Sequence, residues 1–222
     1  MRRTLFFLVI GLLGLAILLW LGTWQLQRRA WKEALLSDIE ARISAAPAAL
    51  PADPDPEANR YLPVEVTGEM LAPELHVLVS RKHIGAGYRI IAPFRTGDRT
   101  ILVDRGFVPT PDKDLAREIG RMTVTGNLHW PDEIDRFTPE PEIDRNIWFA
   151  RDVDAMAAAM ETEPLLLVAR SQTDPGVTPL PVDTAGIPND HLHYAITWYG
   201  LALVWAGMTG IFLWRNRARA RS

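Results

Sequence analysis

Two long stretches without a charged residue, one near each end of the chain, constrain its fold more than any other feature. They cover residues 5–24 and 194–214. Each holds about 20 residues, and a helix of that length spans the hydrocarbon core of a bilayer, about 30 Å thick. Backbone groups in lipid must hydrogen-bond within their own segment, so both stretches are predicted to be helices. A core helix of a soluble protein would explain one stretch, but two at opposite ends predict two membrane spans.

The basic residues around these spans predict how the chain lies in the membrane. Arginines flank the pair on its terminal sides, at Arg2, Arg3, Arg215, Arg217, Arg219 and Arg221. By the positive-inside rule, both termini face the cytoplasm. Arg28, Arg29 and Lys32 argue the other way for the first span, but two spans place both termini on one side. The stretch from Glu33 to His193 holds 27 acidic and 15 basic residues, a net charge of −12, and we expect it outside the cytoplasm.

We predict a bacterial inner membrane as the location, with the main domain in the periplasm. A cleaved signal peptide is the alternative for the first stretch, but its apolar part exceeds the roughly 7–15 residues typical of one, and Gly22-Thr23-Trp24-Gln25 is a poor cleavage site. So few residues precede this stretch that a mitochondrial transit peptide is not expected.

The predicted segments are a cytoplasmic N-terminus at 1–4, a transmembrane helix at 5–24, its helical extension at 25–44, an extracytoplasmic β-rich domain at 45–193, a second transmembrane helix at 194–214 and a basic cytoplasmic tail at 215–222.

The segment between the spans shows the pattern of a mostly antiparallel β (α+β) domain. Stretches rich in β-branched residues, separated by Gly or Pro, predict strands at 64–67, 75–79, 89–94, 100–103, 122–128 and 165–169. An apolar face predicts a helix at 151–161. Residues 45–59 and 171–188 are rich in Pro and are expected to be loops. The similar segments 64–68 and 122–126 hint at two equivalent strands.

The sequence does not support catalysis, and we expect a protein that is not an enzyme. It contains no G-x-S-x-G or H-E-x-x-H motif, and Gly85-Ala86-Gly87 lacks the rest of a nucleotide-binding loop. No spacing of carboxylates singles out a metal site. There is no cysteine, which excludes disulfides, thiolate metal sites and covalent haem attachment.

Two histidines at the outer end of the second span stand apart from His76, His83 and His129, for which an ordinary core or surface role is favoured. On a helix, His191 and His193 lie about 200° apart, so they face opposite ways. An aromatic stripe follows His191 at helical spacing: Tyr194, Ala195, Trp198, Ala202 and Trp205. A small-residue face follows His193: Thr197, Gly200, Val204 and Gly207. We expect that second face to pack against another helix, and Gly11 and Gly22 form a similar face on the first span.

Periodicity alone favours ordinary roles for the aromatic stripe and for His191. Tyr194 and Trp198 suit an interfacial aromatic belt, and a histidine suits a polar helix start. Trp205 should lie deeper and fits that account less well. The alternative is a planar apolar cofactor, such as a non-covalent haem with His191 as axial ligand.

Several groups of residues, spread over nearly the whole chain, form a recognisable pattern. They are Leu21-Gly22-Thr23-Trp24-Gln25-Leu26 with Arg28 and Lys32, Gly87-Tyr88 leading to Pro93-Phe94, Ile101-Leu102-Val103-Asp104-Arg105-Gly106-Phe107-Val108-Pro109, Trp148 before Arg151-Asp152, and Asn189-Asp190-His191-Leu192-His193-Tyr194-Ala195-Ile196-Thr197-Trp198-Tyr199. In their order and spacing, and in the two terminal spans, the chain resembles the surfeit locus protein 1 family of cytochrome c oxidase assembly factors. Asp104 departs from the family pattern, which usually has Asn there. That pattern fixes His191, whereas the position of His193 varies.

The resemblance implies a chaperone that binds haem a, non-covalently and transiently, and assists its insertion into the large subunit of a haem–copper oxidase. It further implies haem a synthase and membrane lipids as partners, and no nucleic acid. Carried over by position, His191 is the axial ligand of the haem iron, and the neighbouring aromatic residues Tyr194, Trp198 and Trp205 are the other cofactor-binding candidates. Two alternatives stay open: a haem-free scaffold and an accessory subunit of the oxidase. Four family positions in the β domain are expected to be architectural: Gly87, Tyr88, Arg105 and Gly106.

Overall fold

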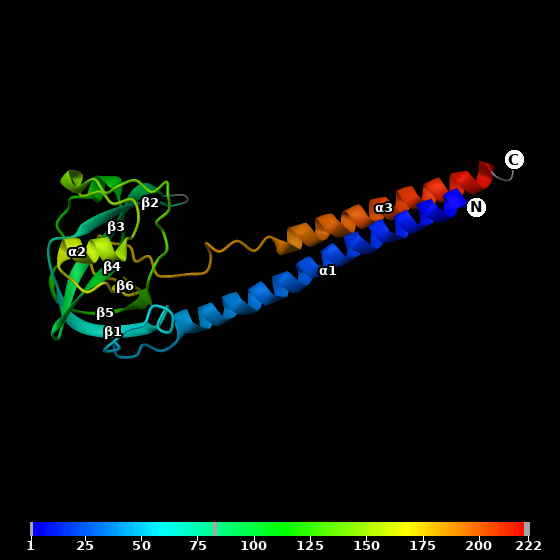
Figure 1. Cartoon of the computed structure of the whole chain (residues 1–222). Coiled ribbons are helices and arrows are strands. Elements are labelled where there is room, and N and C mark those ends of the chain that lie inside the picture. The colour runs from blue at the N-terminus through cyan, green and yellow to red at the C-terminus, as the bar shows by residue number, and fades with distance from the viewer. Residues whose placement is uncertain (1, 82–83, 220–222) are drawn as a thin grey trace. The chain divides into compact units, whose positions relative to one another are not determined.

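The computed structural model describes residues 2–81 and 84–219. The chain divides into two compact units, each described below by itself (Figure 1). One consists of Met1–Asp38 together with Thr184–Ser222, and the other consists of Ile39–Asp183.

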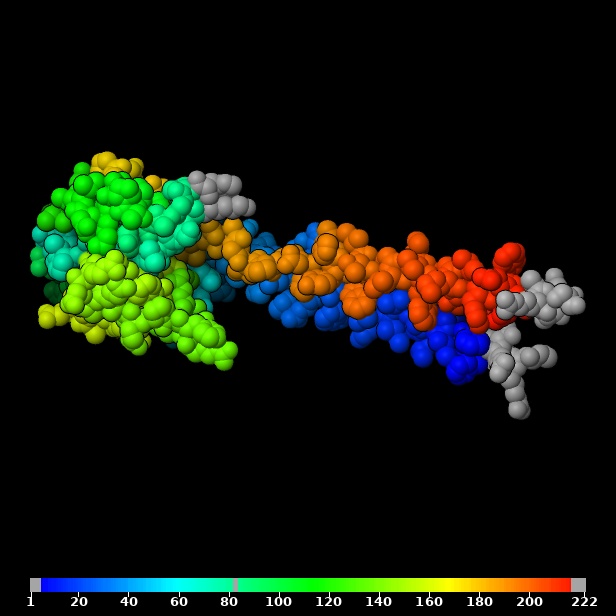
Figure 2. Space-filling view, turned by 90° about the horizontal axis from the view of Figure 1, so that it is seen from above, coloured from blue at the N-terminus to red at the C-terminus, as the bar shows by residue number. Residues whose placement is uncertain are grey.

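The first unit is a pair of long helices, α1 (Arg2–Ser44, whose last turns belong to the second unit) and α3 (His191–Arg219). They lie side by side and run antiparallel (Figures 1 and 2). Both are long and apolar enough to cross a membrane, and most of their large apolar side chains are exposed. An apolar helix with an exposed surface does not belong to a soluble core. The two long apolar helices predicted near the ends of the chain are therefore confirmed, and both are able to cross a membrane. That they span one, and which side the β unit faces, stay predictions.

In the part of the second unit that the structure describes, there are six strands, two short 3₁₀ turns and one short helix. Their bounds are β1 Pro63–Met70, β2 Leu75–Arg81, β3 Gly85–Thr96, β4 Arg99–Pro109, η1 Thr110–Asp112, β5 Gly120–His129, η2 Ile143–Arg145, α2 Val153–Met160 and β6 Leu166–Ala169. All six predicted strands and the predicted helix overlap these elements. This overlap confirms the predictions. The strand predictions succeed because β-branched runs and Gly or Pro breaks are local signals of strands.

The strands close into a barrel, a closure that the prediction of a mostly antiparallel β domain does not contain. That prediction is confirmed in part, because five of the six ladders between the described strands are antiparallel. The order β1-β5-β6-β4-β3 returns to its start because β1 also pairs with β3, through Glu69 opposite Arg95 and Met70 opposite Phe94. β2 joins outside this ring, along β3. One pair, β4 with β6, is parallel. Closure rests on pairings between strands distant in sequence, and local periodicity carries no information about them.

The two similar segments that the sequence contains turn out to be partners. In the β1–β5 ladder, Val64 lies opposite Gly126 and Gly68 opposite Met122, so the two segments pair with each other antiparallel. The hydroxyls of Thr67 and Thr123 lie 2.8 Å apart across that pair. Threonine pairs across strands stabilise a sheet by a few tenths of a kcal/mol to about 1 kcal/mol.

Apolar side chains fill the barrel and a second cluster packs outside it. The inner cluster includes Val64, Phe94 and Leu128. The outer cluster joins Met156 of α2 to Leu102 of β4, among others. The α2 helix begins after its N-cap, Asp152, whose side chain accepts a hydrogen bond of 3.0 Å from the Ala155 N–H.

A β-bulge in β4 turns two charged side chains into the protein interior. Ile90 of β3 lies opposite Gly106, but Ile91 lies opposite Asp104, so Arg105 is an extra residue on β4. Gly106 has a φ of 123°, a conformation that side chains disfavour, and a Cβ there would also collide with the backbone of Thr178. The bulge therefore needs glycine, and it leaves both Asp104 and Arg105 buried.

Candidate functional site

The helix pair brings together the residues that the sequence singles out for cofactor binding. Glycines on α1 let the two helices approach closely. A Cβ on Gly14 would lie 2.7 Å from the indole of Trp205, and one on Gly22 would lie 2.9 Å from the ring of Tyr199. Small residues let apolar helices pack their backbones together in lipid, where hydrophobic burial between helices gives no advantage. A Cβ on Gly11 would collide with the side chain of Thr209, so the face predicted from Gly11 and Gly22 is confirmed.

The corresponding prediction for the second span is wrong. Among the described residues, nothing lies within 4 Å of a Cβ built on Gly200 or Gly207, so this face of α3 does not pack on α1. Ala195 and Ala202, on the face that follows His191, are buried instead. Periodicity shows which residues share a face, but the partner helix decides which face is covered.

His191 makes a specific contact with the first helix. Its Nδ1 lies 2.8 Å from Oε1 of Gln25. An amide oxygen can only accept a hydrogen bond, so Nδ1 carries the proton and donates it. In the neutral ring Nε2 then holds the lone pair, and no hydrogen bond to Nε2 is found within residues 2–81 and 84–219.

The side chains around His191 leave an incompletely satisfied polar site. The Oδ1 of Asn189 is buried and has no hydrogen-bond partner in the part of the chain that the structure describes. Trp198 is half-buried, about 10 Å further along the helix axis from His191, and Tyr194 is exposed. His193 is exposed, with its ring edge-on to Tyr194 at 6.3 Å, and makes no hydrogen bond to the described residues of α1.

Trp205 has a role in the helix contact. Its Nε1 donates a 2.9 Å hydrogen bond to the carbonyl of Gly11, and its ring packs over Gly14. It lies about 21 Å along the axis from His191. That Trp205 also touches a cofactor stays a prediction.

A second candidate is the buried ion network of the β unit. Asp104 is fully buried and accepts hydrogen bonds from Arg89, at 2.5 Å, and from Arg151, at 3.3 Å. Arg151 also binds Glu133 through its backbone N–H and guanidinium. Burial opposes ionisation of Glu133, but hydrogen bonds and charge from Arg151 outweigh it and hold the pKa of Glu133 below its usual value. Two arginines therefore compensate the buried carboxylate, as a structural ion network requires.

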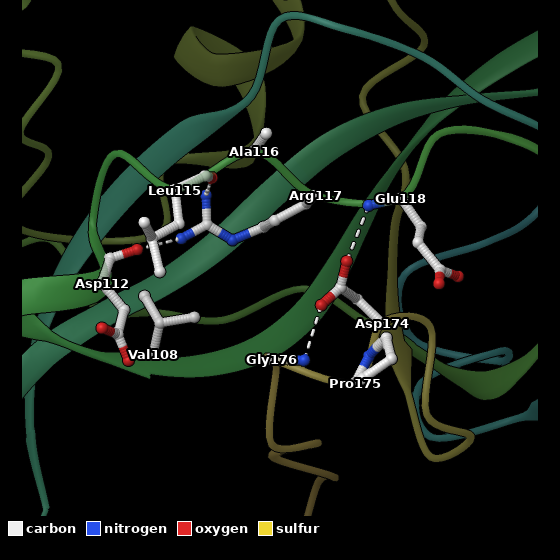
Figure 3. A pocket seen from close by; sticks show the side chains of 9 residues that line it. All are labelled: Val108, Asp112, Leu115, Ala116, Arg117, Glu118, Asp174, Pro175 and Gly176. Carbon is white, nitrogen blue, oxygen red and sulfur yellow. Dashed lines mark hydrogen bonds between the residues drawn. The ribbon is translucent and has the colours of Figure 1, made fainter.

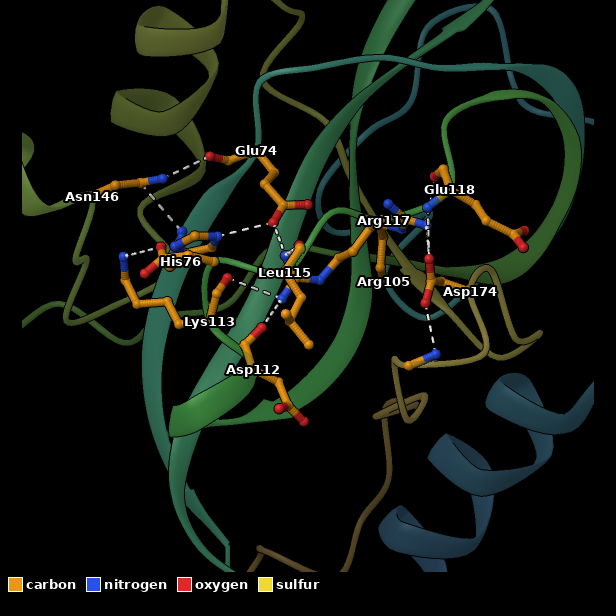
Figure 4. Close-up of polar contacts among 12 residues, drawn as sticks. Glu74, His76, Arg105, Asp112, Lys113, Leu115, Arg117, Glu118, Asn146 and Asp174 are labelled. Carbon is orange, nitrogen blue, oxygen red and sulfur yellow. Dashed lines mark hydrogen bonds and ion pairs between the residues drawn. The ribbon is translucent and has the colours of Figure 1, made fainter.

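Arg105 belongs to a neighbouring network around the bulge (Figure 4). Its Nε donates to the Thr173 hydroxyl at 3.1 Å, and its Nη2 donates to the carbonyls of Glu118 and Thr173. Burial lowers the pKa of Arg105, and the nearby carboxylate of Asp174, at 3.8 Å, opposes that shift. Gly87 lies close to Val108 and Phe107, where a Cβ would not fit, and Tyr88 is buried. These contacts support an architectural role for the four family positions in this unit.

A pocket of about 470 Å³ lies in the β unit beside these networks (Figure 3). Several of its polar groups are already engaged. The Arg117 guanidinium binds Glu74 and three backbone carbonyls, and Asp174 accepts from the N–H groups of Glu118 and Gly176. Within the described residues, no three His, Cys, Asp or Glu side chains are grouped as metal ligands would be. The helix pair is therefore the better candidate site.

One residue of this site was missed by sequence reasoning, namely Gln25. It lies three residues after Gly22, on the face of α1 that α3 covers. That spacing was the available signal, and it did not show which residue of α3 would lie opposite.

Comparison with known proteins gives a consistent result. The model of the SURF1 family matches residues 12–203. The surfeit locus protein 1 of Rattus norvegicus is 35% identical over 206 residues, covering 82% of this chain and 67% of the relative. That of Homo sapiens is 35% identical over 208 residues, with 82% and 69% covered. The SURF1-like protein of Monosiga brevicollis is 35% identical over 227 residues, with 91% and 86% covered. With a family match over most of its length, the chain belongs to the SURF1 family.

Proposed function

We propose that this chain is an assembly factor for haem–copper cytochrome c oxidase, which binds haem a and assists its insertion into the large oxidase subunit. Membership of a family of oxidase assembly factors supports the assembly role. The hydrogen bonding around His191 supports haem a as the ligand, and this observation carries the proposal.

The residues present fit a haem. The Nε2 of His191 has no partner in the described chain, while its Nδ1–H is donated to an oxygen, as in most metal-binding histidines. The orphan Oδ1 of Asn189 could accept from a polar group of a ligand. Trp198, half-buried on the same helix face, and Tyr194 supply aromatic surface. Trp205 remains a candidate deeper in the span.

These residues would hold the group weakly enough to release it. Haem supplies the redox-active iron that the oxidase needs. The chain has no cysteine, so it cannot attach haem through thioethers. One imidazole ligand without a covalent link suits a protein that passes its cofactor on.

The proposed location is a bacterial inner membrane, with both termini in the cytoplasm and the β unit in the periplasm. The basic terminal flanks and the acidic β unit support this orientation. The proposed partners are the large oxidase subunit, haem a synthase and membrane lipids. The protein is not proposed to catalyse a reaction or to bind nucleic acid.

Absorption titration with haem a in detergent tests the proposal. The wild type should give a haem Soret band, and His191→Ala should lose it or shift it. Trp198→Ala should weaken binding by about 1–3 kcal/mol, because an aromatic side chain loses that much when its burial is lost. His193→Ala is the matched control and should keep the spectrum.

Two results would contradict the proposal. A wild-type chain that binds no haem would favour a haem-free scaffold. If His193→Ala loses haem and His191→Ala retains it, His191 is not the ligand. Constant co-purification with the mature oxidase would instead favour an accessory subunit.

A further inference from the structure

We propose that Gln25 is a positioning residue for the haem ligand: it fixes the tautomer of His191 and makes the site a property of both membrane helices. This inference rests on the proposed function, since it concerns the same histidine. It adds that the first helix determines whether the histidine on the second can bind iron.

The first step of the argument is the chemistry of the contact. Iron binds the imidazole nitrogen that carries the lone pair, and a proton on that nitrogen blocks binding. The 2.8 Å contact joins Nδ1 to the oxygen of the Gln25 amide, which keeps the proton on Nδ1. Nε2 is therefore ready to bind iron before any ligand arrives.

The second step is that Gln25 itself is held in place. One turn before it, Gly22 lets the Tyr199 ring approach α1. The adjacent Thr23 donates to the Leu19 carbonyl at 2.9 Å, and its Oγ1 lies 3.0 Å from the Tyr199 hydroxyl. Because the threonine proton is engaged with Leu19, the tyrosine hydroxyl donates across the interface. The packing of the Tyr199 ring against Gly22, rather than the hydroxyl contact, therefore holds Gln25 opposite His191.

The third step concerns the strength of the ligand. A hydrogen bond from the far nitrogen of a metal-binding histidine raises the basicity of the ring, and its removal typically weakens metal binding about 10–100-fold. A neutral amide accepts this bond moderately well. A carboxylate at the same position would accept it more strongly, make the imidazole a better donor and favour ferric over ferrous iron.

Four variants of the full-length chain in detergent, measured beside the wild type, test the inference. Gln25→Leu removes the acceptor, and Gln25→Glu strengthens it. Thr23→Val is the matched control, because it removes an interhelical hydrogen bond without touching His191. His191→Ala reports whether this histidine is the ligand. The readouts are haem a affinity, the midpoint potential of the bound haem, the iron–histidine stretching band of the ferrous form, and the ¹⁵N shifts of His191 without haem.

We expect Gln25→Leu to bind haem about 10–100-fold more weakly and to lower the frequency of the iron–histidine band. Gln25→Glu should retain binding and raise that frequency. Its midpoint potential should fall, by about 59 mV for each tenfold gain in preference for ferric iron. Thr23→Val should match the wild type in all of these. The ¹⁵N shifts should show an unprotonated Nε2 in the wild type and a mixture of tautomers in Gln25→Leu.

The outcomes separate this inference from the proposed function. Haem binding through His191 that is unchanged in Gln25→Leu, or equally weakened in Thr23→Val, would overturn the role of Gln25. Affinity that falls with unchanged vibrational and ¹⁵N signatures would assign Gln25 a packing role only. A fixed tautomer in a wild type that binds no haem would sink the proposed function and leave the tautomer effect standing.

Discussion

Trp205 donates its indole proton to the carbonyl of Gly11 on the opposite helix, at 2.9 Å, while its ring occupies the space above Gly14. The side chain thus uses both its polar atom and its flat face to join the two helices. An interhelical hydrogen bond in lipid contributes on the order of 1 kcal/mol. Close packing of the ring over Gly14, which has no side chain, adds further to the stability of the helix pair.

Gly14→Leu should therefore separate the helices at this point, because the new side chain must displace the ring. Gly207→Leu, where a Cβ meets no atom within 4 Å, is the matched control. The rings of Phe7 and Phe212 have their centroids 4.7 Å apart. Replacing both by cysteine lets a short thiol cross-linker report whether the two helices stay close. Cross-linking should fall in Gly14→Leu and persist in Gly207→Leu. Equal yields in both would contradict this packing.

The membrane orientation can be checked with alkaline phosphatase, which is active only outside the cytoplasm. A fusion after Pro131 should be active, because the basic terminal flanks and the net charge of −12 between the spans predict that the β unit lies outside the cytoplasm. A fusion after Ser222 should be inactive. The reverse pattern would overturn the proposed topology.

The cellular role predicts a selective respiratory defect. Deleting the gene should lower haem–copper oxidase activity and leave the other respiratory complexes near normal, because only the oxidase needs haem a. Spectra of isolated membranes give the haem a content alongside the activities. Normal oxidase activity and haem content, in a strain without a second copy of the gene, would contradict the assembly role.

Asp104 is expected to matter for stability. Asp104→Ala leaves Arg89 and Arg151 without their shared buried carboxylate, and breaking such a pair typically costs roughly 3–5 kcal/mol. Asp104→Asn should cost less because it keeps a hydrogen-bond acceptor. Urea unfolding followed by tryptophan fluorescence measures the difference. Glu69→Gln, which removes one partner of an exposed ion pair with Arg95, should change stability by less than about 1 kcal/mol.

His129 should make stability depend on pH. Burial, with the charges of Arg151 and Arg60, lowers its pKa from 6.5 to about 4. As the pH falls below 6.5, the unfolded chain takes up a proton that the folded protein does not bind until about pH 4. The histidine therefore destabilises the fold progressively through this window, by up to roughly 3 kcal/mol.

The measurement is the free energy of unfolding of wild type and His129→Gln between pH 7 and pH 4.5. The difference between the two should change steadily below pH 6.5, with the wild type losing more stability. A constant difference across the window would show that His129 titrates normally in the folded protein.

The sequence predicts the elements of this protein better than their assembly. Charge-free runs mark α1 and α3, and β-branched runs mark all six strands, because both signals are local. The β1–β3 closure and the parallel β4–β6 pair depend on which distant strands meet. The bulge at Arg105 could be suspected only from the glycine that follows it.

For the candidate site, too, the sequence predicts the residues better than their arrangement. The sequence identifies His191 because a histidine begins an aromatic helix, and its place in the family motif supports the choice. The sequence does not reveal that the face with Ala195 and Ala202 is the covered one, or that Gln25 lies opposite. Both depend on the register of two helices that are separated by more than 140 residues of chain.

Closure of the barrel has a consequence for how other proteins can recognise this unit. Each strand of the ring has hydrogen-bonded neighbours on both sides. The open side of β2 is partly occupied by Trp148, whose N–H donates to the His76 carbonyl and whose carbonyl accepts from Leu78. In this part of the described chain, little backbone is left for a foreign strand to extend the sheet. Any protein that docks here must therefore be recognised through side chains and loops, whose chemistry can change while the barrel stays the same.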